Sequence, residues 1–346
     1  MGQPAFDAVK QYLDDFYMFG PPDVLYKYDR MADELASEAA RLINCQPDEV
    51  TYIKNTTEGI NIASEALPLA AGDEVLVLGN EYPANLLPWL KKRQEGVKVQ
   101  VIKGTDSAEA FQRLLQAITP RTVVVTISSA QYYDGFMANI GQLSGICRKN
   151  SIYLVVDAVQ SVGVRKLDLQ ATPVDFLVCG GQKYLQAGVG CGFLYVNAGI
   201  MPHLRHTKVG IRSMESFDDD SYTLKTTAGR FQDGTQNLAG IVALHAALKH
   251  VNTVGMEAIE HKNIGLLHAA KSYLTDCSIP FIDYGDRQSN IVSLKVSDPS
   301  GLAAFLQDQS VYIKPIKDVA RLSFNNNSRP EDIETLSKLT RQWLSR

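Results

Sequence analysis

Two short segments place reactive side chains directly after apolar runs. Residues 152–156 are apolar and end at Asp157, and residues 176–179 are followed by two glycines, Gln182 and Lys183. Open α/β sheets bind ligands at the carboxyl ends of their strands, so we expect a carboxylate and an amine at one sheet edge. The amine can hold a carbonyl cofactor as an imine, and the carboxylate can pair with its ring nitrogen. The structural alternatives are a helix-capping Asp157 and a solvated turn lysine.

The elements that must position these side chains alternate between apolar strands and amphipathic helices. Strands are predicted at Glu74–Leu78, Val99–Ile102, Thr122–Thr126, Ile152–Val156, Phe176–Cys179 and Phe193–Val196. These runs are rich in Val and Ile and too continuous to be amphipathic, which is typical of buried parallel strands. Crossover helices are predicted at Asn85–Glu95, Ala108–Ile118 and Ile140–Asn150. The alternation predicts an α/β fold whose mainly parallel sheet is covered on both faces.

A second pattern follows a loop-rich stretch over residues 197–237. Its predicted elements are helices from Leu238 to about Val251 and from about Met256 to Leu274, a strand at Asn290–Val296, a helix at Gly301–Asp308, a strand at Val311–Ile316, and a final helix that Ser328 and Pro330 begin. This order is typical of a small α+β domain. We therefore predict a large domain over residues 1–240 and a small domain over residues 241–346. Whether about the first 15 residues pack with the small domain stays open.

The order of several motifs resembles the class V aminotransferase and cysteine desulfurase group of pyridoxal-phosphate (PLP) enzymes. The resemblance covers residues from about 50 to 325. The motifs that carry it are the phosphate-binding turn 55–61, the cofactor-stacking turn 81–85, the segment 157–160 ahead of Lys183, the turn 234–237, and the carboxylate-binding Arg321. It implies fold type I of the PLP-dependent transferases, with Lys183 holding PLP as a Schiff base.

The resemblance also assigns roles to individual residues. Lys183, Asp157 and Tyr82 are the expected catalytic residues, and Arg321 is the expected clamp for the substrate carboxylate because a guanidinium fork matches a carboxylate. The remaining expected contacts are with PLP itself: Thr56 and Thr57 with its phosphate, Tyr82 and Val159 on its ring faces, Gln160 at its phenolic oxygen, Gln182 beside the lysine, and Thr235 reaching the phosphate of the partner subunit. Thr235 thus implies a homodimer.

The chain departs from cysteine desulfurases of this group near the lysine and near the arginine. Gly180 and Gln182 stand where those enzymes commonly carry Ser and His, and residues 311–321 contain no Cys to attack a substrate sulfur. The favoured reaction is therefore β-elimination by a carbon–sulfur lyase acting on a cysteine-like amino acid. Epimerisation as in isopenicillin N epimerase, transamination and cysteine desulfuration remain alternatives, and a noncatalytic scaffold with this fold is a remote one.

Composition and motifs exclude other classes of protein. The 34 Lys plus Arg against 38 Asp plus Glu give a net charge of -4, which offers no footprint for nucleic acid. No apolar stretch approaches the roughly 20 residues of a membrane span, and no secretory signal is visible, so we expect a cytoplasmic protein. Scattered cysteines and the isolated pair His203 and His206 predict no metal site. Residues 188–192 imitate a dinucleotide fingerprint but precede a strand, which argues against NAD.

Overall fold

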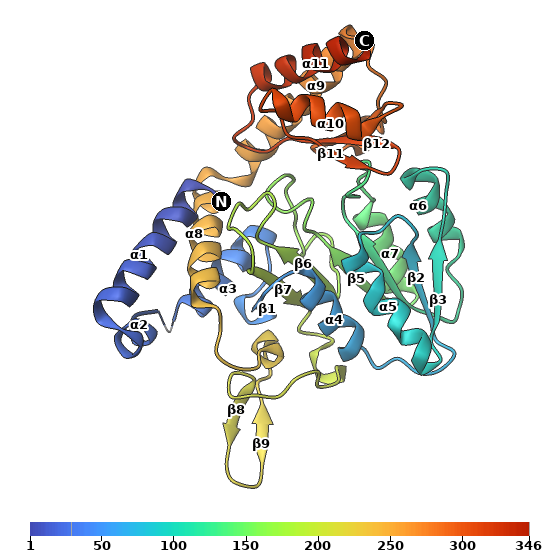
Figure 1. The fold of residues 1–346 in the computed structure, drawn as a ribbon. Coiled ribbons are helices and arrows are strands. Elements are labelled where there is room, and N and C mark those ends of the chain that lie inside the picture. Colours follow the sequence, from blue (N-terminus) through green and yellow to red (C-terminus); the bar gives the residue numbers. More distant parts are fainter. Residues whose placement is uncertain (29, 346) are drawn as a thin grey trace.

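The computed structural model describes residues 1–28 and 30–345 and contains a large α/β unit with a smaller unit beside it (Figure 1). The helices are α1 (Gln3–Phe19), α2 (Pro21–Tyr28), α3 (Met31–Ile43), α4 (Thr56–Ala66), α5 (Leu87–Lys91), α6 (Ser107–Gln116), α7 (Ile140–Lys149), α8 (Leu238–Val254), α9 (Met256–Asp276), α10 (Pro299–Asp308) and α11 (Pro330–Leu344). In the part that the structure describes, no helix is both long and apolar enough to cross a membrane.

The large unit is built on a seven-stranded sheet with the order β1-β7-β6-β5-β4-β2-β3. Its strands are β1 (Val50–Ile53), β2 (Glu74–Leu78), β3 (Lys98–Ile102), β4 (Thr122–Ser128), β5 (Tyr153–Asp157), β6 (Phe176–Gly180) and β7 (Gly192–Val196). The five neighbouring strands β3, β2, β4, β5 and β6 are parallel, as predicted. However, β7 pairs antiparallel with both β6 and β1. The prediction that residues 193–196 form a parallel strand was therefore wrong, because a continuous apolar run indicates burial and not direction.

Because β7 runs antiparallel to β6, the segment between them, which carries Lys183, is the loop of a β-hairpin. The chain leaves β6 at Gly180 and returns into β7 at Gly192 without a crossover helix. Two backbone hydrogen bonds close this loop: Gly181 N donates to Cys191 O at 2.8 Å, and Ala187 N donates to Gly181 O at 2.9 Å. The lysine is therefore held on a tight loop at the carboxyl edge of β5 and β6.

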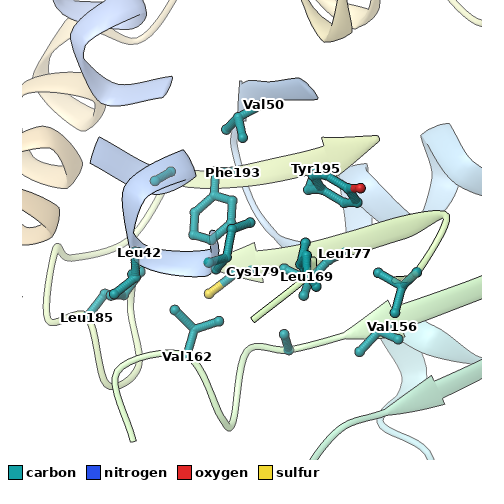
Figure 2. Packing of buried hydrophobic residues seen from close by; sticks show 14 of the residues in the cluster. Leu42, Val50, Val156, Val162, Leu169, Leu177, Cys179, Leu185, Phe193 and Tyr195 are labelled. Carbon is teal, nitrogen blue, oxygen red and sulfur yellow. The ribbon is translucent and has the colours of Figure 1, made fainter. Parts of the chain in front are cut away.

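Apolar side chains on both faces of the sheet form the core. On β6, Leu177 and Cys179 belong to the cluster that includes residues of α3, α7 and α8, whereas Phe176 and Val178 belong to the cluster under α4. Figure 2 shows the first cluster, where Phe193 and Leu177 lie among side chains from neighbouring strands and loops. The alternation along the strand follows from the two-residue period of side chains in a β-strand. Both faces are covered, as the strand pattern predicts.

The predicted helix over residues 85–95 is broken into short pieces. A 3-10 turn spans Pro83–Asn85, the α-helix α5 spans only Leu87–Lys91, and a second 3-10 turn spans Lys92–Glu95. Proline lacks an N–H and fixes its φ angle, so Pro83 and Pro88 favour the first turns of short helices over a continuous one. Short pieces bring residues 81–85 close to the end of β4.

The small unit has a core of its own around a three-stranded antiparallel sheet in the order β10-β12-β11. Its strands are β10 (Ile291–Lys295), β11 (Lys314–Ile316) and β12 (Val319–Ser323), and β12, which carries Arg321, is not among the predicted elements. A two-stranded arm of β8 (Met214–Phe217) and β9 (Tyr222–Leu224) extends from the opposite end of the molecule (Figure 1). Helix α8 packs against α1 and α3, and the domain boundary near residue 240 stays a prediction.

Candidate active site

A cavity of about 290 Å³ lies at the carboxyl edge of the large sheet, where strands of the large unit meet β12 of the small one. It brings together nine of the ten predicted site residues: Thr56, Thr57, Tyr82, Asp157, Val159, Gln160, Gln182, Lys183 and Arg321. Asn55, Ala84, Ser128 and Tyr132 complete its wall. Thr235 does not line the cavity and is exposed on the segment before α8, so its role toward a partner subunit stays a prediction.

One end of the cavity is a helix N-terminus with an unused donor. Asn55 caps α4, because its Oδ1 accepts the backbone N–H of Glu58 at 2.9 Å. Thr56 is buried, and its hydroxyl has no hydrogen-bond partner within the described residues. Gly59 lets this helix approach β6, since a Cβ there would lie 2.4 Å from Val178 Cγ1. A buried orphan hydroxyl beside free N–H groups and a positive dipole end fits the phosphate of PLP.

The two departures from desulfurases near the lysine are coupled in space. A Cβ on Gly180 would lie 2.4 Å from the side-chain oxygen of Gln182 and 3.1 Å from the hydroxyl of Thr56. Gln182 therefore occupies the space that a larger residue at position 180 would need. The absence of a side chain at Gly180 leaves room for the Gln182 side chain beside the N-terminus of α4.

Asp157 ends β5 and is only 2 % exposed. Burial raises the pKa of this carboxyl to about 7, although the hydrogen bond from Val159 N at 3.0 Å and the charge of Lys183 act in the opposite direction. The charge of Glu81 adds to the increase. A buried carboxylate with few donors is stabilised by a cation placed against it, and the protonated pyridine nitrogen of PLP is such a cation.

Lys183 is exposed to the cavity from the hairpin between β6 and β7. Desolvation lowers the pKa of its ammonium group, the guanidinium of Arg321 lowers it further, and Asp157 opposes both effects. A lower pKa increases the fraction of free amine, which is the form that attacks a carbonyl or accepts a proton. The position and the electrostatics suit the predicted role.

Arg321 enters the site from β12, where it pairs with Ser293 of β10 and Lys314 of β11. Its Nη1 donates to the carbonyl oxygen of Tyr132 at 2.8 Å, and its Nε is buried without a partner among the described residues. Protein thus fixes Nη1 of the guanidinium, whereas Nε is a buried donor without a protein partner. A carboxylate matches a guanidinium edge in two parallel hydrogen bonds.

Sequence reasoning missed Glu81, which lies behind the cavity wall. Its carboxylate accepts hydrogen bonds from Ser128 N at 2.7 Å and Gln131 Nε2 at 2.8 Å, and it also contacts the Ser128 hydroxyl. Burial raises the pKa of Glu81, and these hydrogen bonds oppose the shift. The network ties the turn that carries Tyr82 to the end of β4. Glu81 comes three residues after the run 74–78, so a carboxylate shortly after an apolar run is a weaker form of the signal that identifies Asp157.

Sequence reasoning also missed Ser128, which is the last residue of β4, and Tyr132, which lies in the loop after it. Ser128 lies opposite Asp157 in the register of β4 and β5. The ring of Tyr132 meets that of Tyr82 edge to face, with centroids 5.2 Å apart and planes at 81°. Tyr82 itself is 53 % exposed, which leaves its ring accessible for stacking. No motif marks these residues in the sequence, because their importance depends on how the strands are ordered.

Comparison with known proteins supports one family. The family model for aminotransferase class-V matches residues 27–336. A probable cysteine desulfurase of Methanothermobacter thermautotrophicus is 29 % identical over 314 residues, which cover 88 % of this chain and 78 % of that protein. A second probable cysteine desulfurase, from Pyrococcus abyssi, is 25 % identical over 352 residues, covering 93 % and 87 %.

Solved structures share the fold at lower identity. A cystine C-S lyase in complex with its product cysteine persulfide superimposes with a TM-score of 0.91 at 21 % identity, covering 98 % of this chain and 94 % of that one. A cysteine desulfurase from Thermococcus onnurineus gives 0.88 at 22 % identity, covering 100 % and 92 %. The predicted PLP-transferase fold is confirmed. Because the family model covers most of the chain, this protein belongs to the aminotransferase class-V family of PLP-dependent enzymes.

Proposed function

We propose that this protein is a PLP-dependent carbon–sulfur lyase that removes the β-sulfur substituent of a cysteine-like amino acid. The observation that carries the proposal is the make-up of one cavity. It joins an amine, a buried carboxylate and a guanidinium with an unpaired Nε, and no cysteine is among its lining residues in the part of the chain that the structure describes. When bound, PLP supplies an electron sink for the pair left at Cα.

The residues of the chain divide the work among binding, orientation and proton transfer. Thr56 and Thr57 would hold the phosphate at the N-terminus of α4, and Asp157 would pair with the ring nitrogen. Arg321 binds the substrate carboxylate through its unpaired Nε and so fixes Cα near Lys183. Lys183 would hold PLP through Nζ, and its free amine would take the Cα proton at Nζ. The Cβ–S bond then breaks, and hydrolysis yields pyruvate, ammonia and a thiol or persulfide.

Further cofactor contacts complete the proposal. Tyr82 would stack on one ring face of PLP and Val159 on the other, Gln160 would hydrogen-bond its phenolic oxygen, and Gln182 would lie beside the lysine. Thr235 of one subunit contributes to the phosphate site of its partner in a homodimer. Light scattering of the purified protein should therefore give a dimer, and a monomer with full PLP affinity would contradict this role of Thr235. We also propose a cytoplasmic location and no nucleic-acid partner.

Cysteine desulfurase is the second candidate, because the relatives with the highest similarity reported above carry that name. A desulfurase needs a thiolate that attacks the substrate sulfur. Here the turn between β11 and β12 consists of Lys317 and Asp318, and of the five cysteines, Cys147, Cys179 and Cys191 are buried while Cys45 and Cys277 lie outside the cavity. Burial also raises the pKa of Cys179, which makes its thiolate unfavourable. Elimination is therefore favoured over persulfide transfer to the enzyme.

A substrate panel tests the reaction. The PLP-loaded protein is incubated with cystine, S-substituted cysteines, cysteine and ordinary amino acids, and pyruvate, ammonia, alanine, D-isomer and pyridoxamine phosphate are measured. Pyruvate and ammonia in equal amounts from a sulfur substrate support elimination. Alanine from cysteine would identify a desulfurase, D-isomer an epimerase, and pyridoxamine phosphate an aminotransferase. Lys183→Ala is the control that separates enzymatic from spontaneous breakdown.

A further inference from the structure

Tyr132 lines the cavity but has no role in the proposed binding of PLP or in the proposed reaction. It is half-buried, and within the described residues its hydroxyl makes no hydrogen bond. Its ring packs edge to face on Tyr82. A phenol that is partly removed from water and lacks a protein partner is stabilised when a ligand accepts its hydrogen bond.

The surroundings of Tyr132 indicate what kind of ligand this is. Tyr132 and Arg321 line the same cavity, and the guanidinium charge acts on the phenol of Tyr132. The backbone carbonyl oxygen of Tyr132 also accepts Arg321 Nη1 at 2.8 Å, which ties the two residues together. Burial raises the pKa of the phenol, as does Tyr82, and the charge of Arg321 opposes both. The hydroxyl therefore stays protonated at neutral pH and is a donor. A donor beside a cation favours an anionic acceptor.

The loop that follows Tyr132 is fastened to the small unit, which holds the residue in place. The carbonyl oxygen of Tyr133 accepts the hydroxyl of Ser293 at 2.6 Å. The carboxylate of Asp134 accepts Tyr284 OH at 2.8 Å, and its carbonyl accepts Gln288 Nε2 at 2.7 Å. Since Arg321 belongs to the same small sheet as Ser293, the loop and the arginine are held in a fixed relation. Such preorganisation is what a recognition site requires.

We propose that the hydroxyl of Tyr132 is a second donor to the substrate carboxylate bound by Arg321, which makes Tyr132 a specificity-determining residue for amino acids with a free α-carboxylate. The inference rests on the proposed function, since it requires Arg321 to hold that carboxylate. It predicts that the site discriminates strongly against neutral amides of the same substrate. A hydrogen bond to a charged group accounts for about 10-fold to 100-fold in affinity.

A pair of unreactive ligands tests this directly. 3-(Methylthio)propionate lacks the amino group that would displace Lys183. Its primary amide is neutral and carries an NH2 donor in place of one acceptor oxygen. Binding of both to the PLP-loaded protein is measured by calorimetry. The wild type should prefer the acid, and Tyr132→Phe should lose about 10-fold or more of its affinity for the acid and clearly less of its affinity for the amide, because a hydrogen bond to a charged acceptor contributes more than one to a neutral acceptor.

Tyr133→Phe is the matched control, because Tyr133 bonds Asp318 outside the cavity and holds the loop through its backbone carbonyl. It should bind both ligands like the wild type. A Tyr132→Phe protein that binds the acid as tightly as the wild type, or that loses acid and amide equally, overturns the role of Tyr132. A wild type with no preference for the acid overturns the carboxylate site itself, and with it the assignment of Arg321.

Discussion

The two sheets that meet at the cavity contribute to it in different ways. The edge of the seven-stranded sheet supplies Asp157 directly and positions Lys183 and the α4 N-terminus. Among the described residues that line the cavity, the three-stranded sheet supplies Arg321, and this residue touches the large unit through the carbonyl of Tyr132. In the proposed mechanism the large sheet carries the groups for cofactor chemistry, and the small sheet carries the arginine that binds the substrate together with Tyr132 of the loop after β4. Changes on the two sides should have separable effects.

The largest effect is expected on the large-sheet side. Lys183→Ala removes both the attachment point for PLP and the base at Cα, so turnover should fall on the order of 10³-fold or more. The measurements are pyruvate release and the visible absorption of the purified protein, which should lose its lysine-bound PLP band. Circular dichroism serves as the folding control. A Lys183→Ala protein that keeps the wild-type spectrum and rate would contradict the assigned role of Lys183.

Asp157 provides a second test on the same side, through stability without cofactor. Its folded-state pKa of about 7 exceeds the ordinary value of 3.8, so the carboxyl stabilises the fold below pH 4 and this contribution is lost as pH rises toward 7. Asp157→Asn removes the titration. The variant should gain stability relative to the PLP-free wild type between pH 5 and 8, by on the order of 4 kcal/mol at most. Urea denaturation of both proteins at each pH measures the gain, and a constant difference would contradict it.

On the small-sheet side the effect should be smaller and confined to substrate. Arg321→Lys keeps the charge but loses the planar edge that matches a carboxylate, so KM should rise by about 10-fold to 100-fold. The affinity for PLP should not change, because Arg321 has no assigned contact with it. Steady-state kinetics and PLP titration measure the two quantities separately. If Arg321→Lys weakened PLP affinity as much as substrate binding, the contributions of the large and small sheets would not be separable.

The smallest effect on PLP affinity is expected for an isosteric substitution of Glu81, which lies behind the cavity wall. Glu81→Gln preserves the shape and an acceptor for Ser128 N, so PLP affinity should change by about threefold or less. Glu81→Ala leaves Ser128 and Gln131 unpaired in the interior and should cost about 1–3 kcal/mol of stability. Thermal unfolding and PLP titration of both variants distinguish these outcomes. Equal losses in the two variants would show that the charge, and not the network, matters at position 81.

The sequence predicts the two sides of the molecule unequally well, for physical reasons. Buried strands such as β2 are visible as uninterrupted apolar runs, and its predicted bounds agree with the structure. The direction of β7 and the presence of the short β12 depend on pairing with strands that are distant in sequence. Asp157 is found because it directly follows such a run, and Lys183 because it comes four residues after one, beyond two glycines and a glutamine. Tyr132 is not, because its environment is made by Tyr82 and Arg321, which come from other elements.

The hairpin that holds Lys183 bears on the order in which the site is assembled during folding. Its closing contacts join residues that are about ten positions apart, such as Gly181 and Cys191, so they can form as soon as this segment collapses. The bond between Arg321 and Tyr132 joins residues 189 positions apart in the sequence and requires the small unit to dock. The lysine loop should consequently be native in early intermediates, with capture of the cofactor preceding the ability to recognise an amino acid.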